Sequence, residues 1–188
     1  MVLQVRRARP EDAPAIGAIH REAWQDAYPG ILPDAYLIGL DERRIAAGYL
    51  RAMLARRGGE AVFVACAGDG QPVGFASAGR ARRAGIAEGE VETLYILPDW
   101  REQGIGRRLM RASAAHLSAI GCGSAMLWVL SENAAGWFYR RLGARPVGKE
   151  RIPVGGRAVE QTALLWDPID LLLDATAATR ERDARGEG

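Results

Sequence analysis

Two glycines lie one residue apart where a strand-like run of residues passes into a helix-like run. The stretch 91–110 reads VETLYILPDWREQGIGRRLM, so Gly104 and Gly106 stand at the expected beginning of the helix. Glycine lets a backbone approach a ligand closely, and the unpaired N–H groups at the beginning of a helix bind anions. A phosphate group is therefore one candidate ligand. The alternative is a strand-to-helix turn whose glycines serve only close packing.

The residues around the glycines exclude two common phosphate-binding motifs. A dinucleotide-binding loop needs a third glycine in G-x-G-x-x-G, but Arg107, Arg108 and Leu109 follow here. A Walker loop needs a lysine before serine or threonine, and Lys149 is the only lysine of the chain. What remains is the pattern R-x-x-G-x-G, which begins at Arg101. Because the other basic residues are all arginine, a single arginine is weak support for phosphate binding.

Carboxylates and a phenol near this stretch could carry proton-transfer chemistry. Glu90, Glu92 and Leu94 alternate along the expected strand 90–97, and the alternation predicts that they share one face. A carboxylate can act as a general base. The phenol of Tyr139 can protonate a departing thiolate, because a thiol has a pKa of about 8.5 and a phenol about 10. The alternatives are solvated carboxylates at a strand edge and a core tyrosine.

The composition is that of an ordinary globular protein. With 48% hydrophobic residues among 188, the chain is expected to form one compact domain. Its net charge of +2 gives no argument for nucleic acid or a membrane as a partner. Cys66 and Cys122 form no CxxC motif and are accompanied only by His20 and His116, so neither a metal site nor a structural disulfide is expected. Without an apolar run of about 20 residues or a signal peptide, the expected location is the cytoplasm.

Hydrophobic periodicity and turn residues predict the order of the elements. The expected strands are residues 2–7, 61–67, 72–78, 90–97, 124–130, 145–151 and 160–166. The expected helices begin at Pro10 and cover residues 35–40, 42–54, 104–120 and 133–142, with Asn133 as a helix N-cap. A turn-rich segment is expected at residues 24–33. Such a mixture of hairpins and crossovers predicts an α/β fold, a mixed sheet flanked by helices on both faces.

The segment LYILPDWREQGIGRRLM resembles motif A of the GCN5-related N-acetyltransferases (the GNAT family), in which a strand, a proline and R/Q-x-x-G-x-G/A precede a helix. The later segment SENAAGWFYRRLGARPVG resembles the family motif N-x-x-A-x-x-(aromatic)-Y-x-x-x-G-F. Near the N-terminus, VRRARPEDAPAIGAIH and WQDAYPGILPDAYLIGL resemble the family's opening strand and helix and its substrate-side segment. The resemblance implies a GNAT-type acyl-CoA N-acyltransferase domain over residues 1–168. A C-terminal extension over residues 169–188 is expected to be partly helical or disordered.

The resemblance also implies that acetyl-CoA is the co-substrate. In the family, backbone amides of the glycine turn hold the pyrophosphate of coenzyme A, and the pantetheine arm lies between two splayed strands. Carried over by position, the expected cofactor-binding residues are Leu94, Tyr95, Ile96, Leu97, Arg101, Glu102, Gln103, Gly104, Ile105, Gly106, Arg107, Asn133, Gly136 and Tyr139.

Transfer of the acetyl group to a primary amine, by direct attack in a ternary complex, needs three groups from the protein. Some family members take the amine proton with a carboxylate on the motif A strand, which makes Glu92 the first candidate for the base and Glu90 the second. Tyr139 is the candidate proton donor to the leaving sulfur. The backbone N–H of Tyr95 or Ile96 would stabilise the carbonyl oxygen as it gains charge.

Two departures from the family pattern keep a second hypothesis open. Glu102 stands where the family often has a glycine, and Ala144 replaces the usual aromatic residue. They motivate the alternative of a CoA-binding sensor or partner-binding module without catalysis. For the enzyme, the acceptor is expected to be a small-molecule or peptide amine. Trp24 is expected to pack, whereas Tyr28 and Tyr36 either pack or line the acceptor pocket. A homodimer is expected by analogy alone.

Overall fold

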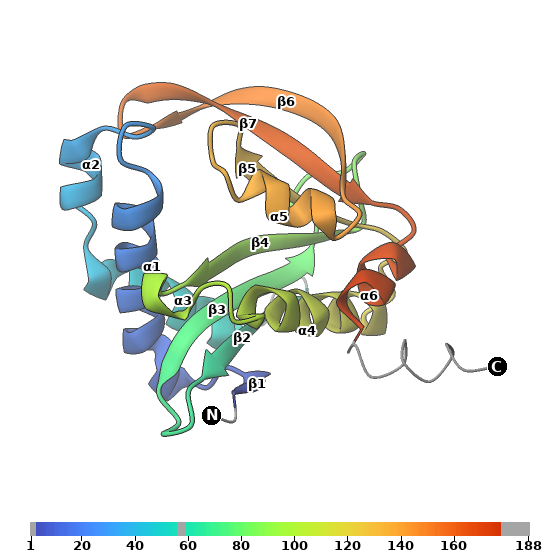
Figure 1. Cartoon of the computed structure of the whole chain (residues 1–188), viewed down its shortest axis with the longest axis horizontal. Coiled ribbons are helices and arrows are strands. Elements are labelled where there is room, and N and C mark those ends of the chain that lie inside the picture. The colour runs from blue at the N-terminus through green and yellow to red at the C-terminus, as the bar shows by residue number, and fades with distance from the viewer. Residues whose placement is uncertain (1–2, 56–58, 178–188) are drawn as a thin grey trace.

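The computed structural model describes residues 3–55 and 59–177, and its centre is a seven-stranded sheet (Figure 1). The strand order is β1-β2-β3-β4-β5-β7-β6. Neighbouring strands pair antiparallel except β4 and β5, which are parallel, so the sheet is mixed. The strands are β1 (Gln4–Arg7), β2 (Ala61–Cys66), β3 (Pro72–Arg80), β4 (Gly89–Ile96), β5 (Ala125–Leu130), β6 (Arg145–Val154) and β7 (Arg157–Trp166).

Helices cover both faces of this sheet (Figure 1). They are the 3-10 helices η1 (Pro10–Asp12) and η3 (Pro98–Trp100) and the α-helices α1 (Ala13–Ala27), α2 (Asp34–Ile38), α3 (Glu42–Ala55), α4 (Ile105–Ala119), α5 (Gly136–Arg141) and α6 (Asp170–Thr176). On one face, Ile16 and Ile19 of α1 pack with Phe75 of β3. On the other face, Leu109 of α4 packs with Ala76 of β3. The expected α/β fold is therefore confirmed.

Two helix boundaries differ from the expectation. Helix α1 continues through Trp24 to residue 27, so the segment expected to be turn-rich begins as helix. Helix α5 begins at Gly136, three residues later than expected. The side chain of Asn133 accepts a hydrogen bond from the backbone N–H of Ala135 at 2.9 Å, and this local bond holds a turn in place of the first helical turn. Asn133 is therefore not the N-cap of α5.

Strands β6 and β7 extend further than the sequence predicts. They pair as far as Val154 and Arg157, and the two residues between them form the hairpin turn. Gly155 and Gly156 have φ angles of 57° and 82°, the left-handed conformations that two-residue hairpins require. Of the first expected strand, residue 2 lies outside the described residues, and β1 begins at Gln4.

A bulge in β4 interrupts the alternation of its side chains. Consecutive residues of β3 pair with Thr93 and Val91, which leaves Glu92 as an extra residue of β4. As a result, Val91 and Leu94 both pack in the hydrophobic cluster on the α4 face, although uninterrupted alternation would put them on opposite faces. The expectation that Leu94 shares one face with Glu90 and Glu92 is wrong, because the bulge lies between them.

Strands β4 and β5 pair over a short distance only. The register joins Gly89 to Ala125 and Glu90 to Met126, and no further pairs of these strands follow in the described residues. Beyond Glu90 the two strands diverge, so backbone groups on both facing edges need another partner. This divergence opens the centre of the sheet.

The C-terminal segment packs against α4. Leu172 of α6 is fully buried in the same cluster as Met110 of α4 and Trp166 of β7. Arg111 and Arg107 of α4 donate hydrogen bonds to backbone carbonyl oxygens at the end of α6, at 3.3 and 3.0 Å. Part of the expected extension is thus helical and joined to the core, and residues 178–188 lie outside the described residues.

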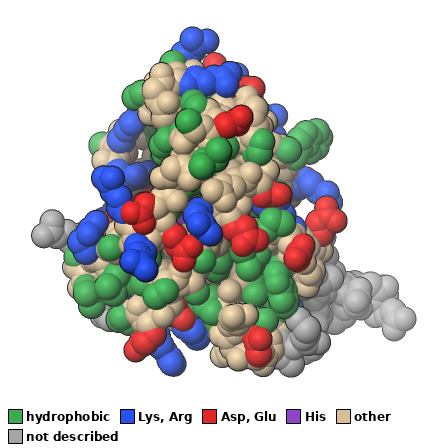
Figure 2. All heavy atoms as spheres, turned by 90° about the vertical axis from the view of Figure 1, so that its left-hand side faces the viewer, with side chains coloured by type: hydrophobic (Ala, Val, Ile, Leu, Met, Phe, Trp, Pro, Cys, Tyr) green, Lys and Arg blue, Asp and Glu red, His purple; other side chains and the backbone are tan. Residues whose placement is uncertain are grey.

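The described residues show no sign of a membrane span or a metal centre. Among residues 3–55 and 59–177, no helix combines the length and apolarity needed to cross a bilayer. The same residues contain no group of three or more histidine, cysteine or acidic side chains able to hold a metal ion. On the face shown in Figure 2, acidic and basic side chains are interspersed rather than gathered into a field of one sign.

Candidate active site

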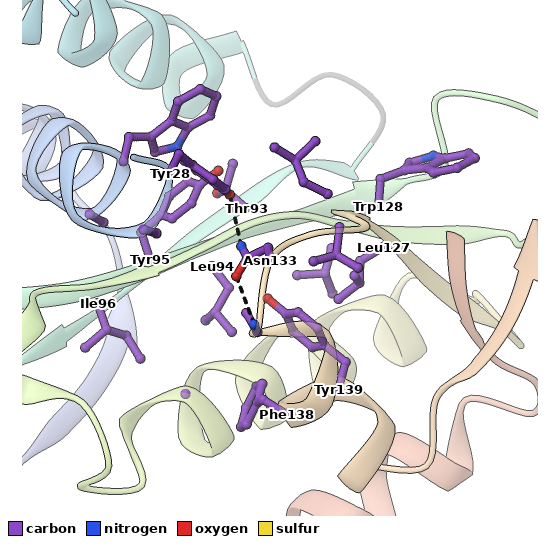
Figure 3. Close-up of a pocket in the computed structure, with 18 of the residues that line it drawn as sticks. Tyr28, Thr93, Leu94, Tyr95, Ile96, Leu127, Trp128, Asn133, Phe138 and Tyr139 are labelled. Carbon is purple, nitrogen blue, oxygen red and sulfur yellow. Dashed lines mark hydrogen bonds between the residues drawn. The ribbon is translucent and has the colours of Figure 1, made fainter. Parts of the chain in front are cut away.

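The divergence of β4 and β5 opens a cavity of about 1180 Å³ (Figure 3). Both strands line it, together with the end of α1, the turn before α4 and the beginning of α5. The cavity brings together most of the residues predicted for the site, namely Glu90, Glu92, Leu94, Tyr95, Ile96, Arg101, Glu102, Gly104, Ile105, Gly106, Arg107, Asn133 and Tyr139. Residues from three separate stretches of the chain, 90–96, 101–107 and 133–139, therefore meet at one place.

Three predicted cofactor residues do not line this cavity. Leu97 packs in the hydrophobic clusters on either side of the sheet. The side chain of Gln103 donates a hydrogen bond to the backbone carbonyl of Asp99 at 3.1 Å. Gly136 is the first residue of α5, where an added Cβ would meet no atom within 4 Å. The motif positions of these residues therefore do not bring them to the wall of the cavity.

The turn before α4 has the backbone conformation that favours glycine at two positions. Gly104 is the N-cap of α4 with φ of 76°, and an added Cβ there would meet nothing within 4 Å. Glu102 also has a positive φ, of 60°, and its side chain is exposed. A non-glycine residue pays a conformational cost in this region, which explains why glycine is common at this position in the family. At the mouth of the cavity, Arg101 forms an ion pair with Asp26 of α1.

Gly106 serves packing rather than backbone conformation. An added Cβ at Gly106 would lie 3.1 Å from Cζ of Phe138 and 3.5 Å from Cδ1 of Ile96. The missing side chain lets α5 approach the beginning of α4 closely, so that Phe138 closes one side of the cavity. Each glycine thus fits a different one of the two hypotheses for the pair. Gly104 leaves open space at the helix N-terminus, as a ligand site needs, and Gly106 allows close packing.

The pairing of β4 with β3 decides which backbone N–H groups face the cavity. The N–H of Leu97 donates to the carbonyl of Val73 at 3.0 Å. Because antiparallel partners exchange bonds at every second residue, Tyr95 turns its N–H toward β3 as well. The N–H groups of Leu94 and Ile96 then point to the opposite edge of β4, where β5 has diverged. Of the two candidate oxyanion donors, Ile96 is the one directed into the gap.

The two glutamates of β4 have different surroundings. Glu90 is buried, and its two carboxylate oxygens accept hydrogen bonds from Arg82 at 2.6 Å (Nη2) and 3.2 Å (Nε). Glu92 lies 4.0 Å from Nε of Arg82, beyond hydrogen-bond distance. Burial raises the pKa of Glu92 above its ordinary value, and the charge of Arg82 opposes this shift. Glu92 is thus partly desolvated and only weakly held, as a general base should be.

A hydrogen bond crosses the cavity between the turn after β5 and the end of α1. Nδ2 of Asn133 donates to the phenol oxygen of Tyr28 at 3.4 Å, while Oδ1 accepts from the N–H of Ala135 (Figure 3). Tyr139 lies below this bridge with its phenol directed into the cavity (Figure 3). Burial raises the pKa of both phenols above the ordinary value, and the pKa of Tyr139 rises further beside Tyr28. Both phenols therefore stay protonated at neutral pH.

The sequence indicated some of these residues better than others. The sequence does not decide whether Tyr28 packs or lines the acceptor pocket, and the structure places it in the cavity wall beside Asn133. Trp24 packs against Tyr28 with ring centroids 5.0 Å apart, and it also lines the cavity. No local pattern could have joined these α1 residues to the turn after β5, because 105 residues separate Tyr28 from Asn133.

Comparisons with known proteins agree with this geometry. A family model described as an acetyltransferase (GNAT) domain matches residues 58–143. An uncharacterized N-acetyltransferase of Bacillus subtilis is 29% identical to this chain. The alignment covers 91% of this chain and 96% of the Bacillus protein. An aminoglycoside N(6')-acetyltransferase type 1 of Stenotrophomonas maltophilia is 36% identical to this chain. The alignment covers 63% of this chain and 69% of the Stenotrophomonas protein. The solved structure of YncA, a putative acetyltransferase of Salmonella typhimurium with acetyl-CoA, superimposes with a TM-score of 0.66 at 22% identity, covering 89% of this chain and 94% of that one.

Together, the splayed strands, the glycine turn and these similarities define an acetyltransferase of the GNAT type, and the chain belongs to the GNAT family. Its sequence relatives in that family are named N-acetyltransferases. The protein is accordingly an N-acetyltransferase.

Proposed function

We propose that the protein transfers the acetyl group of acetyl-CoA to a primary amine by direct attack in a ternary complex. The Salmonella relative in structure is described with acetyl-CoA, which supports the same co-substrate here. The observation that carries the proposal is the cavity between β4 and β5, which has the glycine turn at one end and the carboxylates of β4 at the other. A thioester held between the strands would then lie between a base and an acid.

The residues present fit coenzyme A at the glycine turn. Gly104 leaves open space in front of the first N–H groups of α4, where a pyrophosphate would find unpaired donors. Within the described residues, Nε of Arg107 is buried and has no hydrogen-bond partner. An anion at the turn would supply that partner, since buried donors without acceptors are unfavourable. The N–H groups of Leu94 and Ile96 would pair with the amides of the pantetheine arm.

Each catalytic role falls to a residue of the cavity wall. Acetyl-CoA supplies the activated acyl group. Glu92 accepts a proton from the amine, directly or through one water molecule. The N–H of Ile96 stabilises the negative charge that develops on the acyl oxygen. The phenol of Tyr139 donates its proton to the leaving sulfur, and its raised pKa keeps that proton available across the neutral range.

Titration calorimetry and initial-rate kinetics test this function. We expect acetyl-CoA to bind the isolated protein and free thiol to appear only when an amine is added. Reciprocal plots at several fixed amine concentrations should intersect, because both substrates must be bound before transfer. Parallel lines, which indicate an acyl-enzyme intermediate, would contradict direct attack while leaving acetyl transfer intact.

The alternative of a CoA-binding sensor has little support from the two departures that motivated it. Glu102 is exposed, which allows its charge to point away from an anion at the turn. Ala144 is buried in the cluster on the α4 face and donates its N–H to the carbonyl of Tyr139 at 3.1 Å, so no aromatic side chain is needed there. Tight acetyl-CoA binding without acetylation of any amine would favour the sensor.

A further inference from the structure

The sheet divides the cavity into two halves of different character. On β5, Leu127 and Val129 pack in the cluster on the α4 face, whereas Leu130 packs with Tyr28 in a cluster on the opposite face. Figure 3 shows the same division, with Tyr28 and Trp128 on one side of the strands and Phe138 and Tyr139 on the other. The glycine turn and Tyr139 belong to the α4 side. The other half is therefore the one left for the acceptor, and we call it the acceptor half.

An arch of two segments closes over the acceptor half. Tyr28 and Leu32 from the end of α1 and the following turn are buried together with Val159 of β7. The tip of the β6–β7 hairpin touches α2 so closely that an added Cβ at Gly155 would lie 2.6 Å from Cγ of Tyr36. The apolar side chains that this arch and β5 present to the cavity are Tyr28, Ile31, Leu32, Leu130, Ile152 and Val154.

The charged side chains around the acceptor half are largely engaged with one another. Arg82 is bonded to Glu90, as described above. Nη1 of Arg83 donates to both carboxylate oxygens of Glu150 at 2.8 Å, and its guanidinium lies 6.0 Å from the ring centroid of Trp128. The carboxylate of Glu92, which is 24% exposed, has no such close partner among the described residues. Glu132 and Glu102 also line the cavity but are exposed to solvent, so among the described lining residues Glu92 is the partly buried carboxylate without a close partner, and it matches one ammonium group.

The geometry points to an acceptor that carries its primary amine on an apolar, uncharged body. This inference rests on the proposed acetyl transfer. The amine would meet Glu92, and the body would lie against the wall formed by Leu130, Ile152 and Val154. A second charge on the acceptor would be desolvated against this wall without a partner, which is unfavourable. Polycationic and anionic amines should therefore be poor acceptors.

A matched set of amines tests the inference. Hexylamine, 1,6-diaminohexane and 6-aminohexanoate share one chain and differ at the far end, and kanamycin adds an aminoglycoside. With saturating acetyl-CoA, we expect kcat/KM for hexylamine to exceed the value for each of the others at least tenfold. Preference for the diamine or kanamycin would overturn the inference in favour of recognition of a second cation. Preference for 6-aminohexanoate would overturn it in favour of recognition of a carboxylate by arginine.

A pair of variants on one strand locates the specificity. Ile152 and Val147 both belong to β6, but Ile152 lines the cavity, whereas Val147 does not and is 38% exposed. We expect Ile152→Asp to lower the ratio of kcat/KM for hexylamine to that for diaminohexane at least tenfold, and Val147→Asp to leave it unchanged. The ratio is measured within one preparation, so it does not depend on the folded fraction. An unchanged ratio in Ile152→Asp would overturn the inference.

Different results would contradict the proposed acetyl transfer and the apolar acceptor. If the protein binds no acetyl-CoA, or acetylates no amine at all, the proposed function fails and this inference falls with it. If charged amines are acetylated best, acetyl transfer stands and only the apolar acceptor is wrong.

Discussion

The side chain of Arg82 holds Glu90 through two hydrogen bonds, of 2.6 Å from Nη2 and 3.2 Å from Nε, while the carboxylate of Glu92 lies 4.0 Å from the same guanidinium. The two glutamates therefore differ in availability although they stand two positions apart on one strand. Glu90 is the buried member of its pair with Arg82, whose side chain is 62% exposed, so the buried carboxylate is the group that depends on the pair. Glu92 is the carboxylate that we propose exchanges a proton with the amine.

Replacement of each glutamate by glutamine should separate these roles. We expect Glu92→Gln to lower kcat about 100-fold, the usual contribution of a general base, without a change in the free energy of unfolding. Glu90→Gln removes the charge paired with Arg82, so its main effect should be a lower unfolding midpoint in urea. Steady-state kinetics and urea titration of both variants check this. A larger kcat loss in Glu90→Gln than in Glu92→Gln would exchange the two assignments.

The phenols of Tyr139 and Tyr28 both face the cavity, and their variants distinguish the acid from its neighbour. Tyr139→Phe should lower kcat about 100-fold and leave the dissociation constant of acetyl-CoA unchanged, because only proton donation to sulfur is lost. Tyr28→Phe loses the hydrogen bond from Asn133 and should change kcat much less. A leaving thiol with a low pKa needs no proton donor. With such an acetyl thioester, Tyr139→Phe should therefore lower kcat no more than Tyr28→Phe does. Equal losses with both thioesters would remove the acid role of Tyr139.

Valine at Gly106 and at Gly136 provides a matched test of packing. Both glycines stand at the beginning of a helix, but an added Cβ at Gly106 would lie 3.1 Å from Phe138, and one at Gly136 would meet nothing within 4 Å. We expect Gly106→Val to lower the free energy of unfolding by about 1–3 kcal/mol more than Gly136→Val does, and to weaken acetyl-CoA binding. Urea titration and calorimetry measure the two effects. Equal binding by both variants would show that the contact with Phe138 does not shape the cofactor site.

An ion pair near the N-terminus should make stability depend on pH. Asp12 is buried, accepts hydrogen bonds from both Nη atoms of Arg6 at 2.7 and 2.8 Å, and the bond with Arg6 lowers its pKa. Because the pKa of Asp12 is lower in the folded state, its ion pair stabilises the protein above the unfolded-state pKa of about 3.9. This stabilisation is lost as the pH falls through the folded-state pKa. Asp12→Asn should therefore cost about 1–3 kcal/mol at pH 7, and the difference from wild type should shrink below pH 4. The control is Glu11→Gln, because Glu11 is exposed. In urea titrations over a range of pH, this variant should have the same free energy of unfolding as the wild type.

The sequence predicted the elements well where the signals are local. The hairpin of β2 and β3 and the beginning of α4 lie within two residues of their expected bounds, because glycine turns and apolar periodicity mark them. The bulge at Glu92 was not predicted, since an extra residue in one strand is defined by the register of its neighbour. That bulge is the reason why Leu94 faces α4 while Tyr95 faces α1.

The site was predicted in part for the same reason. Motif positions identified the residues of the turn and Tyr139, which lie close together along two short segments. The wall of the acceptor half joins α1, β5 and the β6–β7 hairpin, and contacts such as that of Tyr36 with Gly155 link residues more than 100 positions apart. No spacing in the sequence reports such contacts.

Quantification of both products in one reaction tests the central claim most directly. Wild-type protein, acetyl-CoA and hexylamine are incubated together, and N-acetylhexylamine and free coenzyme A are measured by mass spectrometry over time. Acetyl transfer in the cavity between β4 and β5 predicts one N-acetylhexylamine for each coenzyme A released, and no release without the amine. Release of coenzyme A without the acetylated amine, or bound acetyl-CoA that never reacts with any amine, would contradict it.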